Sequence, residues 1–251
     1  MRVTDMGALD GKKVVVIGGS GGIGYATAEM AHNEGAHVVL TSRDQKRAEA
    51  AAAKIAGKSG RITPGAVEIG DRAATAAFLK SHGKFDHLVL SGSTVHRLMF
   101  DALPEKESYE SFDSKFWGPF WAAYDGRHHM NKSGSIIFYS GAASRRPLRG
   151  YVVGAAIDGA IDAATRSLAW ELGSEGLRVN CISPGVILTD LIRKGRTQAE
   201  FDKRMEEHSK RVPLGRIGEP SECANAALFL MTCGFVTGEV LAVDGGAESA
   251  P

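Results

Sequence analysis

Three glycines near the start of the chain have a spacing that suits the binding of a pyrophosphate. Residues 14–17 are Val-Val-Val-Ile, and Gly18, Gly22 and Gly24 follow them. Glycines permit a tight turn, and they let backbone N–H groups approach phosphate oxygens closely. Residues 25–33 have the composition of a helix, whose positive N-terminal end favours the same negative charge. Strand, glycine turn and helix in this order predict a dinucleotide-binding turn.

The spacing of this turn resembles the signature of the short-chain dehydrogenase/reductase family. The family pattern is Thr-Gly-x-x-x-Gly-x-Gly, and Ile17 takes the place of the Thr in this chain. Other stretches match the same family, so that the resemblance covers nearly the whole chain. It implies an α/β fold with a doubly wound parallel sheet of about seven strands, a Rossmann-like three-layer sandwich. It also implies a single dinucleotide-binding domain over residues 1–251, with a substrate lid at about residues 189–212.

The strands and helices that must position this turn can be placed from apolar runs and helical composition. Strands buried on both faces of a parallel sheet are apolar throughout, so short aliphatic runs predict them. Such runs fall at residues 14–17, 37–40, 66–69, 85–90, 135–139, 177–183 and 240–243. Helices are predicted at residues 25–33, 43–58, 71–81 with Asp71 as the N-cap, 105–124, 161–172 and 221–231.

The end of the second predicted strand indicates which dinucleotide is bound. In dinucleotide-binding folds an acidic residue here binds the ribose hydroxyls of NAD, whereas an Arg accommodates the 2′-phosphate of NADP. This chain has Ser42 in the acidic position and Arg43 after it. We therefore predict NADP(H) as the cofactor; the alternative is that Arg43 is an ordinary surface arginine.

The family resemblance implies further contacts with the cofactor. The glycine turn, with Gly18, Ser20, Gly22, Ile23 and Gly24, would lie against the pyrophosphate. The remaining contacts would come from Glu68 and Ile69 at the adenine, from Ser91 and Gly92 at a ribose, from Ser140, and from Pro184, Gly185, Ile187 and Thr189 near the nicotinamide. Residues 90–93 depart from the family, because the usual Asn-Asn-Ala-Gly is Leu-Ser-Gly-Ser here.

The residues that usually carry out the chemistry in this family are replaced. Family-like sequence from Thr165 onward fixes the register without gaps. The family's Lys lies seven residues before Thr165, its Tyr four residues before the Lys, and its Ser thirteen before the Tyr. In this chain those positions are Asp158, Gly154 and Gly141, and Lys115 stands where the family has an Asn on a neighbouring helix.

Lys115 and Asp158 are the first candidates to replace this machinery. The two positions face each other in the family, so we predict a pair beside the nicotinamide ribose, since a buried ammonium and carboxylate are costly apart and tolerable together. Lys115 could pass a proton to the substrate oxygen; the alternative is a purely structural ion pair. Tyr151, one turn before the lost Tyr, is a second candidate for the catalytic proton donor. His96 and Arg97 lie on a loop that could touch the substrate.

Composition and charge argue against several classes of protein. The 251 residues carry a formal net charge of +1, which gives no electrostatic reason to expect nucleic acid or a membrane as partner. No apolar run approaches the ~20 residues of a membrane span, and the N-terminus lacks the pattern of a signal peptide. Cys181, Cys223 and Cys233 show no paired spacing. We therefore predict buried thiols, no bound metal and a reducing, cytoplasmic location.

Together these observations predict an NADP(H)-dependent oxidoreductase of an atypical branch that acts on a small carbonyl or alcohol. Two alternatives stay open. One is a non-catalytic NADPH-binding protein, such as a redox sensor or a partner subunit, and the other is non-redox chemistry in the same cleft. Because family members usually assemble through the helix at 105–124 and the helix after the fifth strand, we also expect a homodimer or homotetramer.

Overall fold

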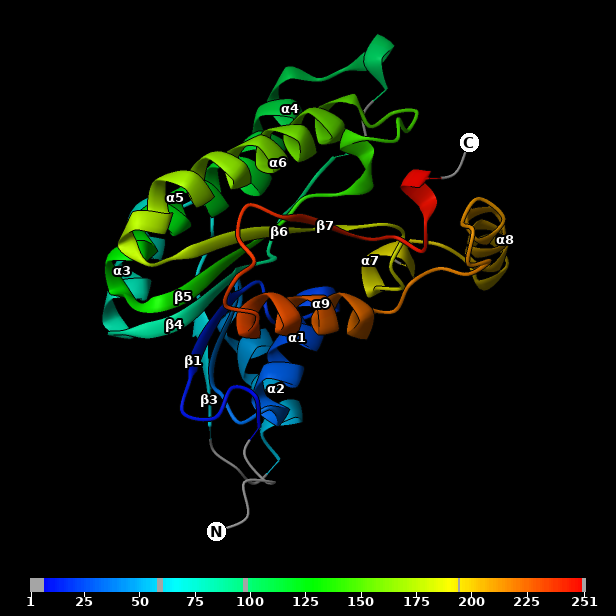
Figure 1. Ribbon diagram of the computed structural model, residues 1–251. Helices are drawn as coiled ribbons and strands as arrows, with labels where there is room; N and C mark the ends of the chain where they lie inside the picture. Colours follow the sequence, from blue (N-terminus) through cyan, green and yellow to red (C-terminus); the bar gives the residue numbers. More distant parts are fainter. Residues whose placement is uncertain (1–6, 58–60, 97–98, 194, 250–251) are drawn as a thin grey trace.

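Seven parallel strands form one sheet in the computed structural model, which describes residues 7–57, 61–96, 99–193 and 195–249. The strand order is β3-β2-β1-β4-β5-β6-β7 (Figure 1). In chain order the strands are β1 Lys13–Ile17, β2 His37–Ser42, β3 Ile62–Ala66, β4 Phe85–Leu90, β5 Met130–Tyr139, β6 Arg178–Pro184 and β7 Val240–Val243.

Helices cover both faces of this sheet. In chain order they are α1 Gly22–Asn33, α2 Gln45–Ala56, α3 Arg72–Ser81, α4 Glu105–Phe112, α5 Gly118–Gly126, α6 Val152–Leu172, α7 Asp190–Arg193, α8 Gln198–Ser209 and α9 Pro220–Thr232. Helices α1, α2 and α9 lie on one face and α3, α5 and α6 on the other (Figure 1). Their buried side chains belong to two separate hydrophobic clusters, one on each face. The predicted doubly wound α/β fold is confirmed.

Side-chain alternation explains why β1 is apolar throughout. Val14 and Val16 belong to the hydrophobic cluster under α1, α2 and α9, while Val15 and Ile17 belong to the cluster on the opposite face. Successive side chains of a strand point to opposite faces, and here both faces are covered. Burial on both sides anchors β1, and with it the start of the glycine turn.

The carboxyl end of β1 lies where the order of strands reverses. β1 pairs in parallel with β2 on one side and with β4 on the other. Connections that leave toward opposite faces of such a sheet open a crevice between them, and ligands of α/β proteins bind there. A ligand site is therefore expected beside the residues that follow β1 and β4.

The third strand lies earlier than residues 66–69, so this prediction is wrong. β3 is Ile62–Ala66 and contains Pro64 and Gly65, which strand propensity disfavours. β3 is an edge strand, where a missing backbone N–H is tolerated because one side has no neighbour. Glu68 and Ile69 consequently lie in the loop that leads to α3.

The helix predicted over 105–124 is present and contains a π-helical segment. Between α4 and α5 the chain forms a π-helical segment, Asp113–Trp117, and Pro119 stands in the first turn of α5. A π-helical turn departs from the regular hydrogen-bond pattern of the helix, and such a place can accommodate a proline, which has no backbone N–H. π-Helical turns within helices are frequent at functional sites, and this one contains Lys115.

The starts of α3 and α6 compare differently with the predictions. Asp71 caps α3 as predicted, because its Oδ1 accepts a hydrogen bond from the backbone N–H of Ala74 at 2.9 Å. α6 begins at Val152 rather than at residue 161, although Gly154 and Gly159 lower the helix propensity of this stretch. Packing of its apolar face against the sheet outweighs that local preference.

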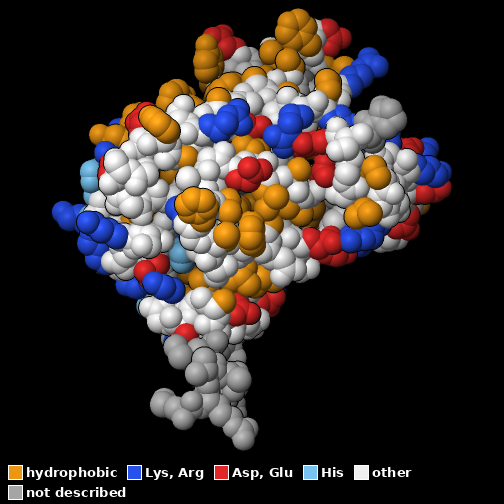
Figure 2. All heavy atoms as spheres, in the orientation of Figure 1, with side chains coloured by type: hydrophobic (Ala, Val, Ile, Leu, Met, Phe, Trp, Pro, Cys, Tyr) orange, Lys and Arg blue, Asp and Glu red, His pale blue; other side chains and the backbone are white. Residues whose placement is uncertain are grey.

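The described residues also bear on surface charge, on membrane-spanning and metal-binding features, and on the cysteines. Acidic and basic side chains are interspersed over the face shown in Figure 2. Within the described ranges, no helix is long and apolar enough to cross a membrane, and no group of three or more His, Cys, Asp or Glu could hold a metal ion. Cys181 and Cys223 are buried as predicted, whereas Cys233 is partly exposed, which corrects the prediction for that residue.

Candidate active site

The glycine turn is in close backbone contact with the segment that follows β4. Gly18 has a φ of +86°, and a Cβ added there would lie 2.3 Å from the Cα of Gly92. The backbone N–H of Gly92 donates to the carbonyl of Ile17 at 2.9 Å. Residue 18 must therefore be glycine for two reasons, its left-handed conformation and its lack of a side chain.

The N-terminus of α1 behind the turn is open to an anion. The N-cap residue, Gly21, offers no side-chain hydrogen bond to the first turn, and that turn contains no acidic residue. The first N–H groups of a helix have no intrahelical partner, so a phosphate can accept from them. Thr189 lies next to Gly22, since a Cβ there would come within 3.2 Å of Thr189 Cγ2.

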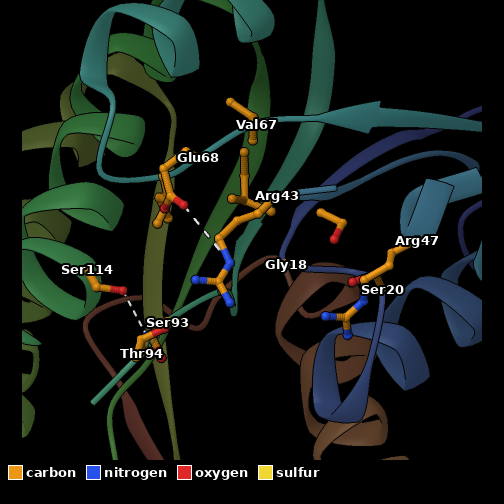
Figure 3. A pocket seen from close by; sticks show the side chains of 13 residues that line it. Gly18, Ser20, Arg43, Arg47, Val67, Glu68, Ser93, Thr94 and Ser114 are labelled. Carbon is orange, nitrogen blue, oxygen red and sulfur yellow. Dashed lines mark hydrogen bonds and ion pairs between the residues drawn. The ribbon is translucent and has the colours of Figure 1, made fainter. Parts of the chain in front are cut away.

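A cavity of about 140 Å³ lies beside the turn (Figure 3). Seven of the predicted cofactor residues line it: Gly18, Ser20, Ser42, Arg43, Glu68, Ile69 and Gly92. Arg43 Nε lies 4.0 Å from Glu68 Oε2, and both side chains are more than half exposed. The end of β2, the loop after β3 and the segment after β4 thus converge on one cavity.

Arg47 also lines this cavity and is absent from the sequence prediction. It comes from the first turn of α2 and points toward Ser20 (Figure 3). The sequence did contain a signal for it. Basic side chains in the first turn of a helix are opposed by the helix dipole, so Arg47 stands where a helix alone would prefer an acidic residue.

Four other predicted cofactor residues support the turn from behind. A Cβ on Gly24 would lie 2.3 Å from both the carbonyl oxygen of Gly18 and Ser91 Oγ. Ser91 Oγ donates to the carbonyl of Ile17 at 3.1 Å. Ile23 packs against the core under α1, and Ile187 is buried in that same core.

The loop after β4 is tied to the helix above it. Thr94 donates its backbone N–H to Ser114 Oγ at 2.8 Å. His96 Nε2 lies 3.7 Å from Glu110 Oε2 on α4. His96 is thus partly exposed and lies beside α4, and the suggestion that it could touch the substrate stays a prediction, while Arg97 lies outside the described residues.

A second and larger cleft, of about 610 Å³, opens at the carboxyl ends of β5 and β6. All three predicted catalytic residues line it, namely Lys115, Tyr151 and Asp158. Three predicted cofactor residues, Ser140, Pro184 and Gly185, line it as well. Its volume lies within the ~300–1,000 Å³ typical of small-molecule sites.

Lys115 and Asp158 form a buried ion pair in the wall of this cleft. Lys115 Nζ donates to Asp158 Oδ1 at 2.5 Å, and the two side chains are 10% and 0% exposed. Burial raises the pKa of the Asp158 carboxyl above its usual range, although the neighbouring ammonium of Lys115 opposes that rise. Asp158 Oδ2 is buried and has no hydrogen-bond partner among the described residues.

Two glycines make room for the side chains of this wall. A Cβ on Gly141 would lie 2.8 Å from Asp158 Oδ2, and a Cβ on Gly154 would lie 2.3 Å from Cε1 of the Tyr151 ring. The Asp158 carboxyl and the Tyr151 ring therefore occupy space that a larger residue at 141 or 154 would need.

The packing of Tyr151 on Gly154 gives a first prediction. Gly154→Ala is expected to destabilise the wild type by about 1–2 kcal/mol, because overpacking outweighs the gain in helix propensity. In a Tyr151→Ala background the same change should stabilise by about 0.5–1 kcal/mol, since only the propensity gain remains. Urea unfolding of the four proteins measures this coupling.

Gly159 in the same helix is the matched control. A Cβ there meets nothing within 4 Å, so Gly159→Ala should stabilise equally in both backgrounds. Equal effects of Gly154→Ala with and without the Tyr151 ring would contradict the described packing.

Comparison with known proteins places this chain in a family. Residues 18–248 match a family model described as enoyl-(acyl carrier protein) reductase. The short-chain dehydrogenase/reductase ATR9 of Stachybotrys chlorohalonatus is 32% identical over 254 residues, covering 96% of this chain and 99% of that protein. The 3-oxoacyl-(acyl carrier protein) reductase FabG of Chlamydia pneumoniae is 31% identical over 246 residues, covering 95% of this chain and 97% of that protein.

A solved structure supports the same assignment. A small-chain dehydrogenase in complex with NADPH is similar with a TM-score of 0.82 and 32% identity, over 96% of this chain and 100% of that one. The family model and these relatives span nearly all of the sequence, and the sheet order is that of the family's Rossmann-like fold. The chain therefore belongs to the short-chain dehydrogenase/reductase family.

Proposed function

We propose that this chain is an atypical NADP(H)-dependent oxidoreductase that acts on a small carbonyl or alcohol, with Lys115 as its proton donor. The observation that carries the proposal is the Lys115–Asp158 pair, joined at 2.5 Å in the wall of the 610 Å³ cleft. Buried ion pairs are costly, and ionisable groups with perturbed environments in a cleft are candidates for function. Family membership supports the redox class.

The residues around the two cavities fit a dinucleotide. The open N-terminus of α1 and the backbone of Gly18 and Gly22 suit the pyrophosphate. Glu68, Ile69 and the Ser91–Gly92 segment would hold the adenosine half. Ser140, Pro184, Gly185, Ile187 and Thr189 would hold the nicotinamide half. The orphaned Asp158 Oδ2 is a buried acceptor that suits a hydroxyl of the nicotinamide ribose.

Because the bound nicotinamide supplies or accepts the hydride, the residues of the chain have to supply or remove the proton. An ammonium carries three N–H donors, and Lys115 uses one of them on Asp158 Oδ1. Its other donors can reach a substrate oxygen in the cleft. As negative charge develops on that oxygen during reduction, Lys115 stabilises it and transfers a proton, and solvent then reprotonates the amine. Asp158 is a positioning residue that holds the ammonium in place.

We further propose that Gly141, Gly154 and Asp158 occupy the positions of the family's Ser, Tyr and Lys. The tight fit of Gly141 to Asp158 and of Gly154 to Tyr151 supports a coordinated replacement. Tyr151 is the second candidate for the proton donor. It is the residue immediately before α6, and both Tyr151 and Asp158 line the cleft.

Selectivity for NADPH is proposed to come from two arginines. Arg43 and Arg47 approach the cavity from the end of β2 and the start of α2 (Figure 3). We expect Arg43→Ala and Arg47→Ala each to weaken NADPH binding by about 10-fold and to change NADH binding little, since charge-assisted hydrogen bonds to a phosphate are lost. Fluorescence titration of the purified protein with both dinucleotides measures this.

Lys46→Ala is the control, because Lys46 neighbours Arg47 but does not line the cavity. A loss of NADH and NADPH affinity in equal measure would contradict the assignment of the two arginines. If the wild type bound neither dinucleotide, the proposed function itself would fail.

Two further family features are proposed for this chain. The lid would comprise residues 189–212, which include α7 and α8, with α8 begun by a capping box between Thr197 and Glu200. A homodimer or homotetramer is supported by the large aromatic side chains left exposed near α5, since Trp117 is 43% and Tyr124 is 45% exposed. A cytoplasmic location stays a prediction.

A further inference from the structure

Two arginines line the cleft beside the Lys115–Asp158 pair, and neither has a carboxylate partner in the described part of the chain. Arg146 follows the short 3-10 turn Ala142–Ser144, and Arg211 follows α8. Arg146 Nη1 donates to the backbone carbonyls of Ala247 and Arg211. Among the described residues, neither guanidinium forms an ion pair with an Asp or Glu.

Arg145, next to Arg146 in the chain, does have carboxylate partners. Arg145 donates to both carboxylate oxygens of Glu248, at 2.5 and 2.7 Å, and lies 3.3 Å from Asp162. Those carboxylates are therefore engaged with Arg145. The one carboxylate in the described lining of the cleft is Asp158, and Lys115 neutralises it. The cleft keeps a surplus of positive charge from Arg146 and Arg211.

The remaining walls of the cleft are largely apolar. Pro147 and Leu148 come from the segment before α6, Val186 follows β6, and Val212 follows α8. A few charged groups that converge in an otherwise apolar cleft of this size orient a small molecule by its polar end. The arginines would bind an anionic end, and the apolar walls would cover the body between that end and the ion pair.

We infer that the substrate is an organic carboxylate with an apolar body, an oxo acid or its hydroxy acid. Arg146 and Arg211 bind its carboxylate, and its reacting oxygen faces Lys115. Arg is suited to this because its planar guanidinium matches a carboxylate in two hydrogen bonds. The inference rests on the proposed function for the identity of the reacting group, whereas the anion site stands on the geometry of the cleft alone.

A matched pair of probes tests the anion site. Isothermal titration calorimetry would compare 4-phenylbutyrate with 4-phenylbutyramide, which share length and apolar body and differ in charge. We expect the acid to bind the wild type about 10-fold more tightly than the amide, with and without NADPH. Arg211→Gln and Arg146→Gln should each remove most of that preference.

Controls separate charge from folding. Arg149→Gln alters an exposed arginine of the same segment that does not line the cleft, and it should leave the preference unchanged. Because Arg146 also holds two backbone carbonyls, Arg146→Lys, which keeps the charge, should retain part of the preference.

The outcomes are distinguishable from those of the proposed function. Equal binding of acid and amide, binding of neither, or a preference that survives both glutamine variants would overturn the anion site. Loss of NADPH binding with the acid preference intact would overturn the proposed function and leave the anion site standing.

Discussion

Lys115→Met is expected to destabilise the protein by about 3–5 kcal/mol, because it leaves the Asp158 carboxylate buried without its partner. Asp158 is 0% exposed, and Lys115 is the group that most lowers its pKa against the effect of burial. Without the ammonium that pKa rises further. A carboxyl whose folded pKa is raised stabilises the fold only while it is protonated. The deficit of Lys115→Met should therefore shrink at low pH and grow as the pH rises through the raised pKa of Asp158.

Urea unfolding at several pH values measures this effect, and two variants make it specific. Lys106→Met removes an ion pair with Glu110 in which Lys106 is 82% exposed, so it should change stability by less than about 0.5 kcal/mol. The double variant Lys115→Met with Asp158→Leu removes both charges, so it should recover most of the lost stability. A pH-independent deficit in Lys115→Met would contradict the buried pair.

The double variant also separates structure from chemistry. If the pair only supports the fold, the recovered protein should turn over substrate at the wild-type rate. If Lys115 donates the proton, the recovered protein should remain slower by ~100-fold or more, within the usual range for loss of a general acid.

Gly18→Ala is expected to abolish useful affinity for NADPH. The change places a Cβ 2.3 Å from both the Cα and the backbone nitrogen of Gly92, at a residue whose φ is +86°. Backbone on both sides must move, and the turn that suits the pyrophosphate moves with it. A loss of ~100-fold or more corresponds to about 3 kcal/mol of binding free energy.

Gly11→Ala separates the two causes of that loss. Gly11 also has a positive φ, of +72°, but a Cβ there meets nothing within 4 Å. It should therefore cost about 1 kcal/mol of stability from backbone strain and leave NADPH affinity unchanged. Fluorescence titration of both variants provides the comparison. Normal affinity in a folded Gly18→Ala protein would show that the turn does not contact the cofactor.

The fold could be predicted where local pattern and burial agree. Residues 14–17 and 85–90 are apolar because both faces of the sheet are covered, so their strands were placed to within a residue. β3 could not be placed in this way. It is an edge strand that contains Pro64 and Gly65, and its position depends on pairing with β2 rather than on its own composition.

The parts of the candidate site also differ in how well the sequence alone predicts them. The glycine turn is a local motif, so the sequence contains it complete. Lys115 and Asp158 lie 43 positions apart in the sequence, and only their alignment with the family pattern predicted that they would be in contact. No such alignment linked Arg146 with Arg211. They are 65 positions apart in the sequence, and Arg146 donates to the backbone carbonyl of Arg211. In the sequence each resembles an ordinary surface arginine.

Hydride transfer between a nicotinamide and a small carbonyl or alcohol, without the usual Ser, Tyr and Lys, is the activity that we propose for this chain. The most direct test is to supply NADPH deuterated at the transferred position, together with a panel of ketones, aldehydes and oxo acids, and to search the products for deuterium by mass spectrometry. We expect a deuterated alcohol, with oxo acids among the reactive substrates. Tight NADPH binding with no deuterium in any product would contradict it and favour a sensor or partner subunit.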